Sequence, residues 1–242
     1  MQTIARNGNA LAFDHAAGAG PTIVFLPGYA SDMSGSKAVA IDGWARETGR
    51  ACLRFDYSGC GASGGAFEDQ TLASWRDDAL AVIDAATSGP VVLVGSSMGG
   101  WIILLAALAR RERVVAMVGI AAAPDFTDWG FTPAQKAALR DEGRIEEHSI
   151  YSPEPTVTTR AFWESGEANR LLDGPVELAV PTRLIHGQRD PDVPWEHSLK
   201  LAGLLRSDDV QTWLVKDGDH RLSRPQDIAL ILKAVEDVTT KP

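Results

Sequence analysis

Residues 91–109 read VVLVGSSMGGWIILLAALA, an apolar run that stops at a glycine-serine turn and then resumes. The run Val91–Val94 is short, rich in β-branched residues and apolar throughout, which is typical of a buried parallel strand. The segment Gly99–Ala109 reads as a buried helix. Between them stands the pattern G-x-S-x-G, centred on Ser97. The stretch therefore predicts a strand, a sharp turn at Ser97 and a helix that opens directly behind the turn.

A serine on such a turn can act as a nucleophile, because the turn exposes its hydroxyl at the end of the sheet. Glycine lacks a Cβ atom, so Gly95 and Gly99 allow the backbone to turn tightly on either side of Ser97. The first N–H groups of the following helix favour negative charge at the site. The alternative is that Ser97 only caps a buried helix. The flanking strand and helix favour the nucleophile.

The same pattern occurs a second time, at Gly61-Ala-Ser63-Gly-Gly65. There the serine stands in a glycine-rich loop that leads to FEDQ (67–70), and no helix opens behind it. We therefore interpret Ser63 as a loop residue. Ser96, next to the candidate nucleophile, falls on the wrong side of the turn.

The rest of the chain alternates strand-like and helix-like segments. Short apolar runs typical of strands cover 22–26, 51–55, 91–94, 114–120, 182–185 and 210–215. Apolar residues fall on one helical face in the regions 72–86 and 228–238. Gln2–Arg6 and Ala10–Ala16 suggest an antiparallel hairpin at one edge. This alternation predicts an α/β fold, with a mostly parallel eight-stranded sheet between layers of helices.

One region, about 124–179, interrupts the alternation and shows no clear strand. It offers helix candidates at Pro133–Glu142 and Thr158–Leu172 and a proline-broken loop at Tyr151–Pro155. Its aromatic residues argue against disorder, and an insertion of this size in a compact domain is usually functional or disordered. We expect a small helical lid over the carboxyl edge of the sheet, within a single domain that spans residues 1–242.

A serine hydroxyl becomes an effective nucleophile only when a base takes its proton, and the base needs an acid that holds its tautomer. With this strand–turn–helix, the chain order is serine, acid, histidine, and the last two follow late strands. Among five histidines, His220 in KDGDHR (216–221) meets both conditions cleanly. Of the others, His15 lies in the N-terminal edge segment and His148 in the lid. His186 ends a strand, and His197 opens a helix.

The acid should follow the strand 182–185, in the loop GQRDPDVP (187–194). Asp190 and Asp192 are both available there. We favour Asp190, because it lies nearer the strand end, where rigid placement is easiest. Either residue could instead be a turn carboxylate beside a proline.

Acyl transfer also needs two N–H groups that stabilise an oxyanion. One should be the backbone N–H of Met98, directly after the nucleophile, and the other should come from the loop after the strand 22–26. In that loop Pro27 has no N–H to donate, and Gly28 allows the backbone to come close. The N–H of Tyr29 is therefore the second candidate.

The chain of 242 residues has a formal net charge of −9 and a sequence pI of about 5.0. An acidic chain repels phosphate backbones, so we expect no nucleic-acid partner.

Two cysteines, Cys52 and Cys60, make no disulfide framework. The apolar stretches Trp101–Ala109 and Val114–Ala123 are too short to span a bilayer. Residues 1–13 show no signal-peptide pattern, so we predict a cytoplasmic protein.

With these residues in place, the chain resembles the α/β-hydrolase superfamily over nearly its whole length. Four segments are together similar to the mitochondrial palmitoyl-protein thioesterase family that also cleaves acyl-glucuronides: FLPGYASDMSGSKA (25–38), RFDYSGCGAS (54–63), VGSSMGGW (94–101) and HGQRDPDVPW (186–195). The resemblance implies an α/β-hydrolase fold and a hydrolase of carboxylic esters or acyl thioesters, with Ser97, Asp190 and His220 as the matching triad. The chain lacks the N-terminal extension that targets that family to mitochondria, which favours a cytoplasmic relative.

The substrate, a small molecule or an acylated protein, should bind between the turn and the lid, against an apolar wall that suits an acyl chain. The residues that we expect to line this pocket are Gly28, Tyr29, Met33, Met98, Trp129, Phe162, Trp163 and Trp195. Since the chain shows no nucleotide-binding glycine loop and no metal-ligand cluster, we expect no cofactor and no metal. Two alternatives stay open: a serine peptidase or carbon–carbon hydrolase on the same fold, or a non-catalytic receptor for small ligands.

Overall fold

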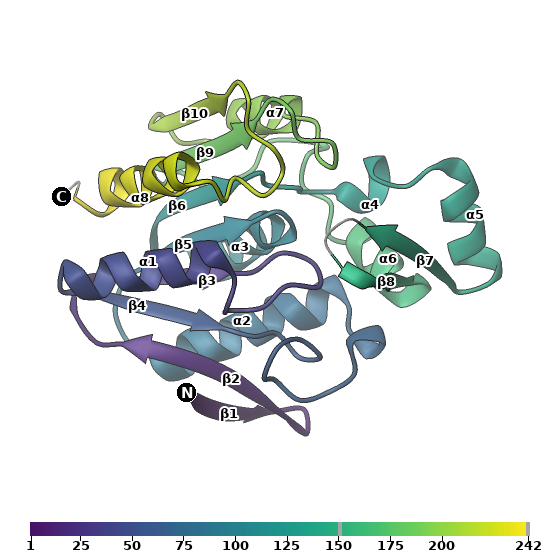
Figure 1. Ribbon diagram of the computed structural model, residues 1–242, viewed down its shortest axis with the longest axis horizontal. Coiled ribbons are helices and arrows are strands. Elements are labelled where there is room, and N and C mark those ends of the chain that lie inside the picture. The colour runs from purple at the N-terminus through teal and green to yellow at the C-terminus, as the bar shows by residue number, and fades with distance from the viewer. Residues whose placement is uncertain (150–151, 241–242) are drawn as a thin grey trace.

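The computed structural model describes residues 1–149 and 152–240. Its centre is an eight-stranded sheet in the order β1-β2-β4-β3-β5-β6-β9-β10 (Figure 1). The strands are β1 (Gln2–Arg6), β2 (Asn9–Ala16), β3 (Ala19–Leu26), β4 (Arg50–Phe55), β5 (Val91–Ser96), β6 (Val114–Ile120), β9 (Thr182–Gly187) and β10 (Val210–Val215). β1 pairs with β2, and β2 with β4, in antiparallel fashion, and the remaining neighbours are parallel. The predicted mostly parallel sheet with an edge hairpin is confirmed.

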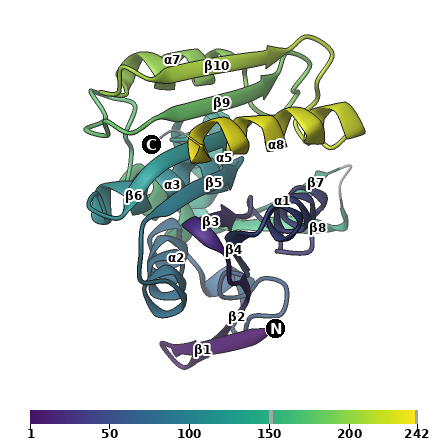
Figure 2. The ribbon, with the colours of Figure 1, turned by 90° about the vertical axis from the view of Figure 1, so that its left-hand side faces the viewer.

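Helices cover both faces of the sheet, which is why the central strands are apolar on both sides. On one face lie α1 (Ser36–Glu47) and α8 (Pro225–Thr239). On the other lie α2 (Leu72–Ala86), α3 (Met98–Ala109) and α7 (Glu196–Leu204). Figure 2 shows α1 and α8 on one side of the sheet and α2 and α3 on the other.

The helix α3 begins where β5 turns and is buried on nearly every side. All of its residues from Met98 to Ala107 are buried. Burial of a single Leu or Ile side chain contributes roughly 1.5–3 kcal/mol, so the apolar run that follows Ser97 fixes this helix firmly against the sheet. The turn at Ser97 is thereby held between two rigid elements.

The inserted region contains three helices and a β-hairpin, which corrects the prediction of a purely helical lid. The helices are α4 (Phe126–Trp129), α5 (Pro133–Asp141) and α6 (Arg160–Glu167), and the hairpin strands are β7 (Arg144–Ser149) and β8 (Ser152–Thr159). Figure 1 shows these elements beyond the ends of the parallel strands. They form a layer at the edge of the sheet where we expected the lid.

The hairpin escaped prediction because its sequence carries prolines and charges that are rare in strands. The loop expected at 151–155 begins at Tyr151, which lies outside the described residues, and continues into β8. The ladder between β7 and β8 is irregular between Glu147 and Ser149. Pro155 lies opposite this irregularity, and proline is tolerated at bulges and in edge strands, where no ladder N–H is lost. A short 3-10 helix, η1 (Phe67–Asp69), lies outside the insertion and contacts β8.

None of the helices in residues 1–149 and 152–240 combines the length and the apolar character that a membrane span requires. Cys52 and Cys60 are both buried, and no disulfide joins them.

Candidate active site

The turn that carries Ser97 has an unusual backbone. Ser97 adopts φ 53° and ψ −119° between β5 and α3, a region that side-chain-bearing residues rarely enter. A Cβ atom on Gly95 would lie 2.2 Å from the carbonyl oxygen of Gly99, and one on Gly99 would lie 2.1 Å from the carbonyl oxygen of Leu26. Only glycine fits at either position, so the G-x-S-x-G spacing has the steric cause that the sequence suggested.

Three side chains from separate loops meet at this turn. The Nε2 atom of His220 lies 3.1 Å from Oγ of Ser97, and its Nδ1 atom lies 2.7 Å from Oδ2 of Asp190. Asp190 follows β9 and His220 follows β10, two neighbouring parallel strands. The carboxyl ends of parallel strands meet at one sheet edge, so the strand order places these residues at the same edge.

Direct contact between the two loops fixes their spacing. A Cβ atom on Gly187 would lie 2.3 Å from the carbonyl oxygen of Gly218, so the loop backbones touch where neither residue has a side chain. The same carbonyl accepts a hydrogen bond of 2.9 Å from the N–H of Arg189. Asp190 is the next residue, and its position is therefore tied to the loop that carries His220.

The carboxylate of Asp190 is fully buried and accepts hydrogen bonds at both oxygens. Oδ1 accepts from the backbone N–H groups of Asp192 and Val193, at 2.8 and 2.9 Å. Oδ2 is shared by His220 and by His186, which lies 3.1 Å away. Burial alone would raise the pKa of Asp190, but the hydrogen bonds from His186, His220 and Val193 outweigh it and hold that pKa well below its ordinary value.

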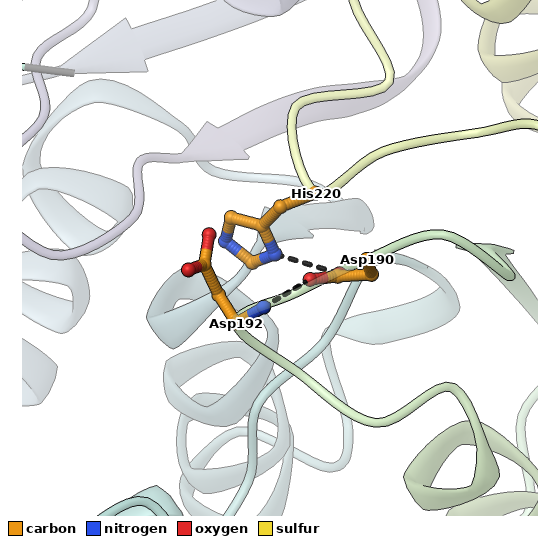
Figure 3. Close-up of side chains that lie close together, drawn as sticks. All are labelled: Asp190, Asp192 and His220. Atoms are coloured by element: carbon orange, nitrogen blue, oxygen red, sulfur yellow. Dashed lines mark hydrogen bonds and ion pairs between the residues drawn. The ribbon is translucent and has the colours of Figure 1, made fainter. Parts of the chain in front are cut away.

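Asp192, the other candidate acid, lies at the exposed side of the same loop (Figure 3). Its backbone N–H supports Asp190. Asp190, Asp192 and His220 offer three atoms within 4.8 Å of one another that could ligate a metal ion. Both Asp190 oxygens and Nδ1 of His220 are already engaged in the hydrogen bonds described above, which an ion would have to displace. The geometry favours Asp190 over Asp192 as the partner of His220.

The loop after β3 passes close to the turn that carries Ser97. A Cβ atom on Gly28 would lie 3.2 Å from the carbonyl oxygen of Ser96 and 3.3 Å from Cβ of Ser97. Tyr29 is the next residue, and Met98 is the first residue of α3, whose opening N–H groups have no acceptor within the helix. The two predicted oxyanion donors thus belong to backbone segments that flank Ser97 on two sides.

A cavity of about 710 Å³ opens beside Ser97 and His220 and extends under the lid. Its apolar lining comes from the loop after β3, the start of α3 and the lid: Pro27, Gly28, Tyr29, Met98, Phe126, Trp129, Phe131 and Val193. Polar groups line it as well, among them Ser31, Asp32, Lys37, Glu147, His148, Thr156, Thr158, Asp192 and Arg221. The volume is in the ordinary range for small-molecule sites, roughly 300–1,000 Å³.

Four residues expected in the pocket do not line this cavity. The N–H of Met33 donates to Oδ1 of Asp56, and Phe162 is buried in the core cluster shared with α2 and α3. Trp163 packs inside the lid and donates from Nε1 to the carbonyl of Thr127. Trp195 stands at the start of α7. Their spacing from Ser97 depends on long-range packing, which residue type and sequence position do not encode.

Several lining residues were missed by the sequence reasoning. The aromatic residues of the lid, which include Phe126 and Phe131, served only as an argument against disorder, and the hairpin residues Thr156 and Thr158 belong to a strand that was not predicted. Lys37 lines the cavity from α1 and donates to the carbonyl of Arg221 at 2.6 Å. Burial, followed by the charge of Arg221, lowers the pKa of Lys37 to about 8, and Asp219 opposes this shift. Lys37 lies in the segment 25–38, one of the four on which the family resemblance rests. That resemblance was the signal in the sequence that could have pointed to Lys37.

The sheet order, the turn at Ser97 and the lid over the carboxyl edge define a hydrolase of the α/β class. The model of the Alpha/beta hydrolase family matches residues 23–231, and the chain belongs to this family.

Known proteins are similar to the chain over almost its whole length. Human palmitoyl-protein thioesterase ABHD10, mitochondrial, is 41% identical over 235 residues, which cover 96% of this chain and 77% of that protein. The solved structure of mouse alpha/beta hydrolase domain-containing protein 10 is 38% identical, with a TM-score of 0.91, and covers 98% of this chain and 96% of its own. A solved structure from Agrobacterium vitis S4 is 44% identical, with a TM-score of 0.92, and covers 98% and 97%.

These relatives correct one prediction. Curated relatives from human, Sumatran orangutan (Pongo abelii) and mouse are all named as mitochondrial proteins. They point to a mitochondrial rather than a cytoplasmic location, so the prediction of a cytoplasmic protein is wrong. Composition and charge do not distinguish these two compartments. The prediction from residues 1–13 is overturned by the location in the names of these relatives.

Proposed function

We propose that the protein is a serine hydrolase of acyl esters or acyl thioesters, with Ser97 as nucleophile, His220 as base and Asp190 as acid. The observation that carries the proposal is the hydrogen-bonded series from Oγ of Ser97 through His220 to Asp190, at 3.1 and 2.7 Å. The relatives named palmitoyl-protein thioesterase support an acyl thioester as one substrate class.

The first step is acylation of Ser97. The carboxylate of Asp190 accepts the hydrogen bond from Nδ1 of His220. The proton therefore lies on Nδ1, and the lone pair of Nε2 faces the hydroxyl of Ser97. Ser97 attacks the acyl carbonyl as His220 takes its proton, and the N–H groups of Tyr29 and Met98 stabilise the oxyanion. The protonated His220 then gives its proton to the leaving alcohol or thiol.

The second step releases the acyl group as a free carboxylic acid. A water molecule, activated by His220, attacks the acyl-serine carbonyl, and the collapse of the second oxyanion returns the proton to Ser97. Asp190 stays ionised throughout and stabilises the imidazolium form of His220. The lowered pKa of Asp190 supports this role, because the carboxylate keeps its charge at neutral pH.

The acyl group fits the apolar part of the cavity. Phe126, Trp129 and Phe131 line the lid side, and Met98 lines the floor next to Ser97. Transfer of an acyl chain to such a wall is favourable by about 0.8 kcal/mol per buried methylene. We therefore propose that the substrate is an acylated small molecule or an acylated protein whose chain lies under the lid.

We also propose that the sheet and the lid function as one domain. Phe162 and Leu172 of the insertion are buried in the same core cluster as Trp75 of α2 and Trp101 of α3. The carbonyl of Asn169 accepts a 3.2 Å hydrogen bond from Nε1 of Trp101. These shared contacts support a lid base that folds together with the sheet.

The test is turnover of p-nitrophenyl esters from acetyl to palmitoyl, together with a palmitoyl thioester, for the wild type and Ser97→Ala. We expect loss of turnover by at least about a thousandfold in the variant. Ser63→Ala is the matched control, because it alters the second G-x-S-x-G pattern. Oγ of Ser63 bonds to the carbonyl of Asp56 and the N–H of Ala12, so this variant should keep its activity at some cost in stability.

Activity that survives in Ser97→Ala would overturn the assignment of the nucleophile. If the wild type turns over neither esters nor thioesters, the same panel extended to peptide and carbon–carbon substrates tests the two other hydrolase activities. Binding of an acyl ligand without turnover would instead indicate a receptor.

A further inference from the structure

The side chain of His186 lies directly behind the proposed acid. It is fully buried at the end of β9. Its Nε2 atom lies 3.1 Å from Oδ2 of Asp190 and 3.0 Å from the carbonyl oxygen of Val193, and its Nδ1 atom lies 2.7 Å from Oγ of Ser198. His186 does not line the cavity. Of the described residues that it contacts through hydrogen bonds, Asp190 is the one proposed to act in the reaction, and Val193 lines the cavity.

The neighbours of His186 determine which nitrogen carries the proton. The carbonyl of Val193 and the carboxylate of Asp190 can only accept hydrogen bonds, so Nε2 is the donor. In the neutral ring, Nδ1 accepts from the hydroxyl of Ser198, which is itself buried. The acceptors at Nε2 therefore set the tautomer that presents an N–H to the acid, and the hydroxyl of Ser198, which donates to Nδ1, helps to hold the ring in that orientation.

As a result, one carboxylate oxygen serves two imidazoles. Oδ2 of Asp190 accepts from Nδ1 of His220 and from Nε2 of His186, while Oδ1 is held by two backbone N–H groups. We propose that His186 is a positioning residue: it orients the Asp190 carboxylate and draws off part of its negative charge, and so sets how strongly Asp190 stabilises the protonated His220. This inference rests on the function proposed above.

The proposal has a definite sign. Without the His186 donor, the negative charge of Oδ2 is directed at His220 alone, which favours the imidazolium form. Protonated His220 cannot act as a base, so kcat/KM falls at low pH. This low-pH side of the pH profile, the acid limb, therefore moves to higher pH in the variant. The carboxylate also loses one of its four fixed hydrogen bonds, and its poorer orientation lowers kcat.

Other ionisable groups near this pair stay in place in every variant below. Asp192 lies in the same loop as Asp190, and its carboxylate is among the three groups gathered around His220. His197 of α7 interacts electrostatically with His186. Asp219 and Arg221 flank His220 in the loop after β10. Because none of them changes, a shift of the acid limb is assigned to His186.

The experiment compares the wild type with His186→Leu and His186→Gln, measuring kcat and KM for the best ester from about pH 5 to about pH 9. In His186→Leu we expect kcat to fall on the order of tenfold to a hundredfold, with KM within about twofold because the residue lies outside the cavity. The acid limb should rise by about half a pH unit or more. In His186→Gln the amide restores an N–H donor, so the acid limb and most of kcat should return.

Two controls separate positioning from packing. Val82→Ala removes buried volume from α2, which packs against α3, α6, β1 and β2, and should lower stability while the acid limb stays at its wild-type position. Ser198→Ala frees the His186 ring and should shift the acid limb in the same direction as His186→Leu, by less. If His186→Leu does not fold, the decision rests on Ser198→Ala. A shift of its acid limb to higher pH supports the proposal, and an acid limb at the wild-type pH overturns it.

An acid limb and kcat in folded His186→Leu that equal those of the wild type would overturn the proposal. So would a His186→Gln variant as impaired as His186→Leu, since that result indicates packing alone. Ser97→Ala is assayed in parallel. Its loss of activity keeps the proposed function intact when the inference fails, whereas activity in Ser97→Ala contradicts the proposed function itself.

Discussion

The hydroxyl of Tyr29 donates a hydrogen bond of 2.9 Å to the carbonyl oxygen of Val157, and thereby joins the loop after β3 to strand β8 of the lid. The ring also packs edge-on against Phe67 and Trp75, with centroids 5.2 and 5.6 Å away. Burial raises the pKa of Tyr29 far above its ordinary value, so the phenol remains a donor at all working pH values. The loop that carries a proposed oxyanion N–H is therefore tied to the lid by its own side chain.

Tyr29→Phe tests this tie, because it removes the hydroxyl and keeps both the ring and the backbone N–H. A neutral hydrogen bond of this kind contributes about 0.5–1.5 kcal/mol. We expect a loss of that size in the free energy of unfolding and a fall of about threefold to tenfold in kcat/KM. Denaturant titration and ester kinetics measure the two effects. Tyr29→Leu should be more severe in both, and equal kinetics for the wild type and Tyr29→Phe would show that the tie does not reach the reaction.

The depressed pKa of Asp190 predicts a pH-dependent contribution to stability. A carboxyl with a lower pKa in the folded than in the unfolded state stabilises the fold above its unfolded pKa, about 3.9. That contribution is lost as the pH falls through the unfolded value toward the folded one. We expect Asp190→Asn to be less stable than the wild type by about 1–3 kcal/mol at neutral pH, and the gap to narrow below about pH 4. Denaturant titration at neutral and acidic pH measures the gap.

The same variant should lose turnover by about a thousandfold to ten-thousandfold, since the amide cannot hold His220 in the tautomer that accepts the serine proton. Asp192→Asn is the matched control. Its backbone N–H still supports Asp190, so it should retain most activity. A larger loss in Asp192→Asn than in Asp190→Asn would reverse the choice of acid.

Two glycines with opposite surroundings test the steric account of the turn. A Cβ atom on Gly99 would lie 2.1 Å from the carbonyl oxygen of Leu26, whereas a Cβ atom on Gly43 in α1 meets nothing within 4 Å. Gly99→Ala should destabilise the protein by about 1–3 kcal/mol or more and abolish turnover. Gly43→Ala should stabilise it by about 0.4–1 kcal/mol and leave turnover unchanged. Thermal unfolding and ester kinetics on both variants measure these effects. If Gly99→Ala keeps its stability and turnover, the steric account of the turn is contradicted.

The turn and the three proposed catalytic residues were predictable from the sequence because their constraints are local or topological. Gly95 and Gly99 flank Ser97 in a pattern that only a tight turn demands, and Asp190 and His220 each follow a strand of a parallel sheet. Chain order then places all three loops at one edge. The same reasoning favoured Asp190 over Asp192 for its nearness to the strand end, and the loop contact between Gly187 and Gly218 accounts for that position.

The pocket was less predictable, because its walls depend on how the insertion folds back. Trp129 and Trp163 are both aromatic residues of the lid, and nothing in their local sequence distinguishes them. The structure places one at the cavity and the other in a separate cluster with Phe131, Leu139 and Ile145. The sequence reasoning did not single out His186, because it ends a strand ahead of the candidate acid and does not lie in the loop after the last strand. Its contact with Oδ2 of Asp190, at 3.1 Å, is visible only in the structure.

These two tryptophans give the sharpest test of where the acyl chain lies. Trp129 lines the cavity and stacks on His197, with ring centroids 4.2 Å apart, whereas Trp163 donates to the carbonyl of Thr127 inside the lid. Trp129→Ala removes an apolar wall, so the ratio of kcat/KM for palmitoyl to acetyl esters should fall by about tenfold.

Trp163→Ala should cost about 2 kcal/mol or more of stability and leave that ratio within about twofold. Both variants lose one indole from the lid, so general loosening of the lid affects them alike, whereas direct contact with the acyl chain separates them. An equal change of the ratio in both variants would assign the effect to loosening. An unchanged ratio in Trp129→Ala would place the acyl chain along another wall of the cavity, away from α4.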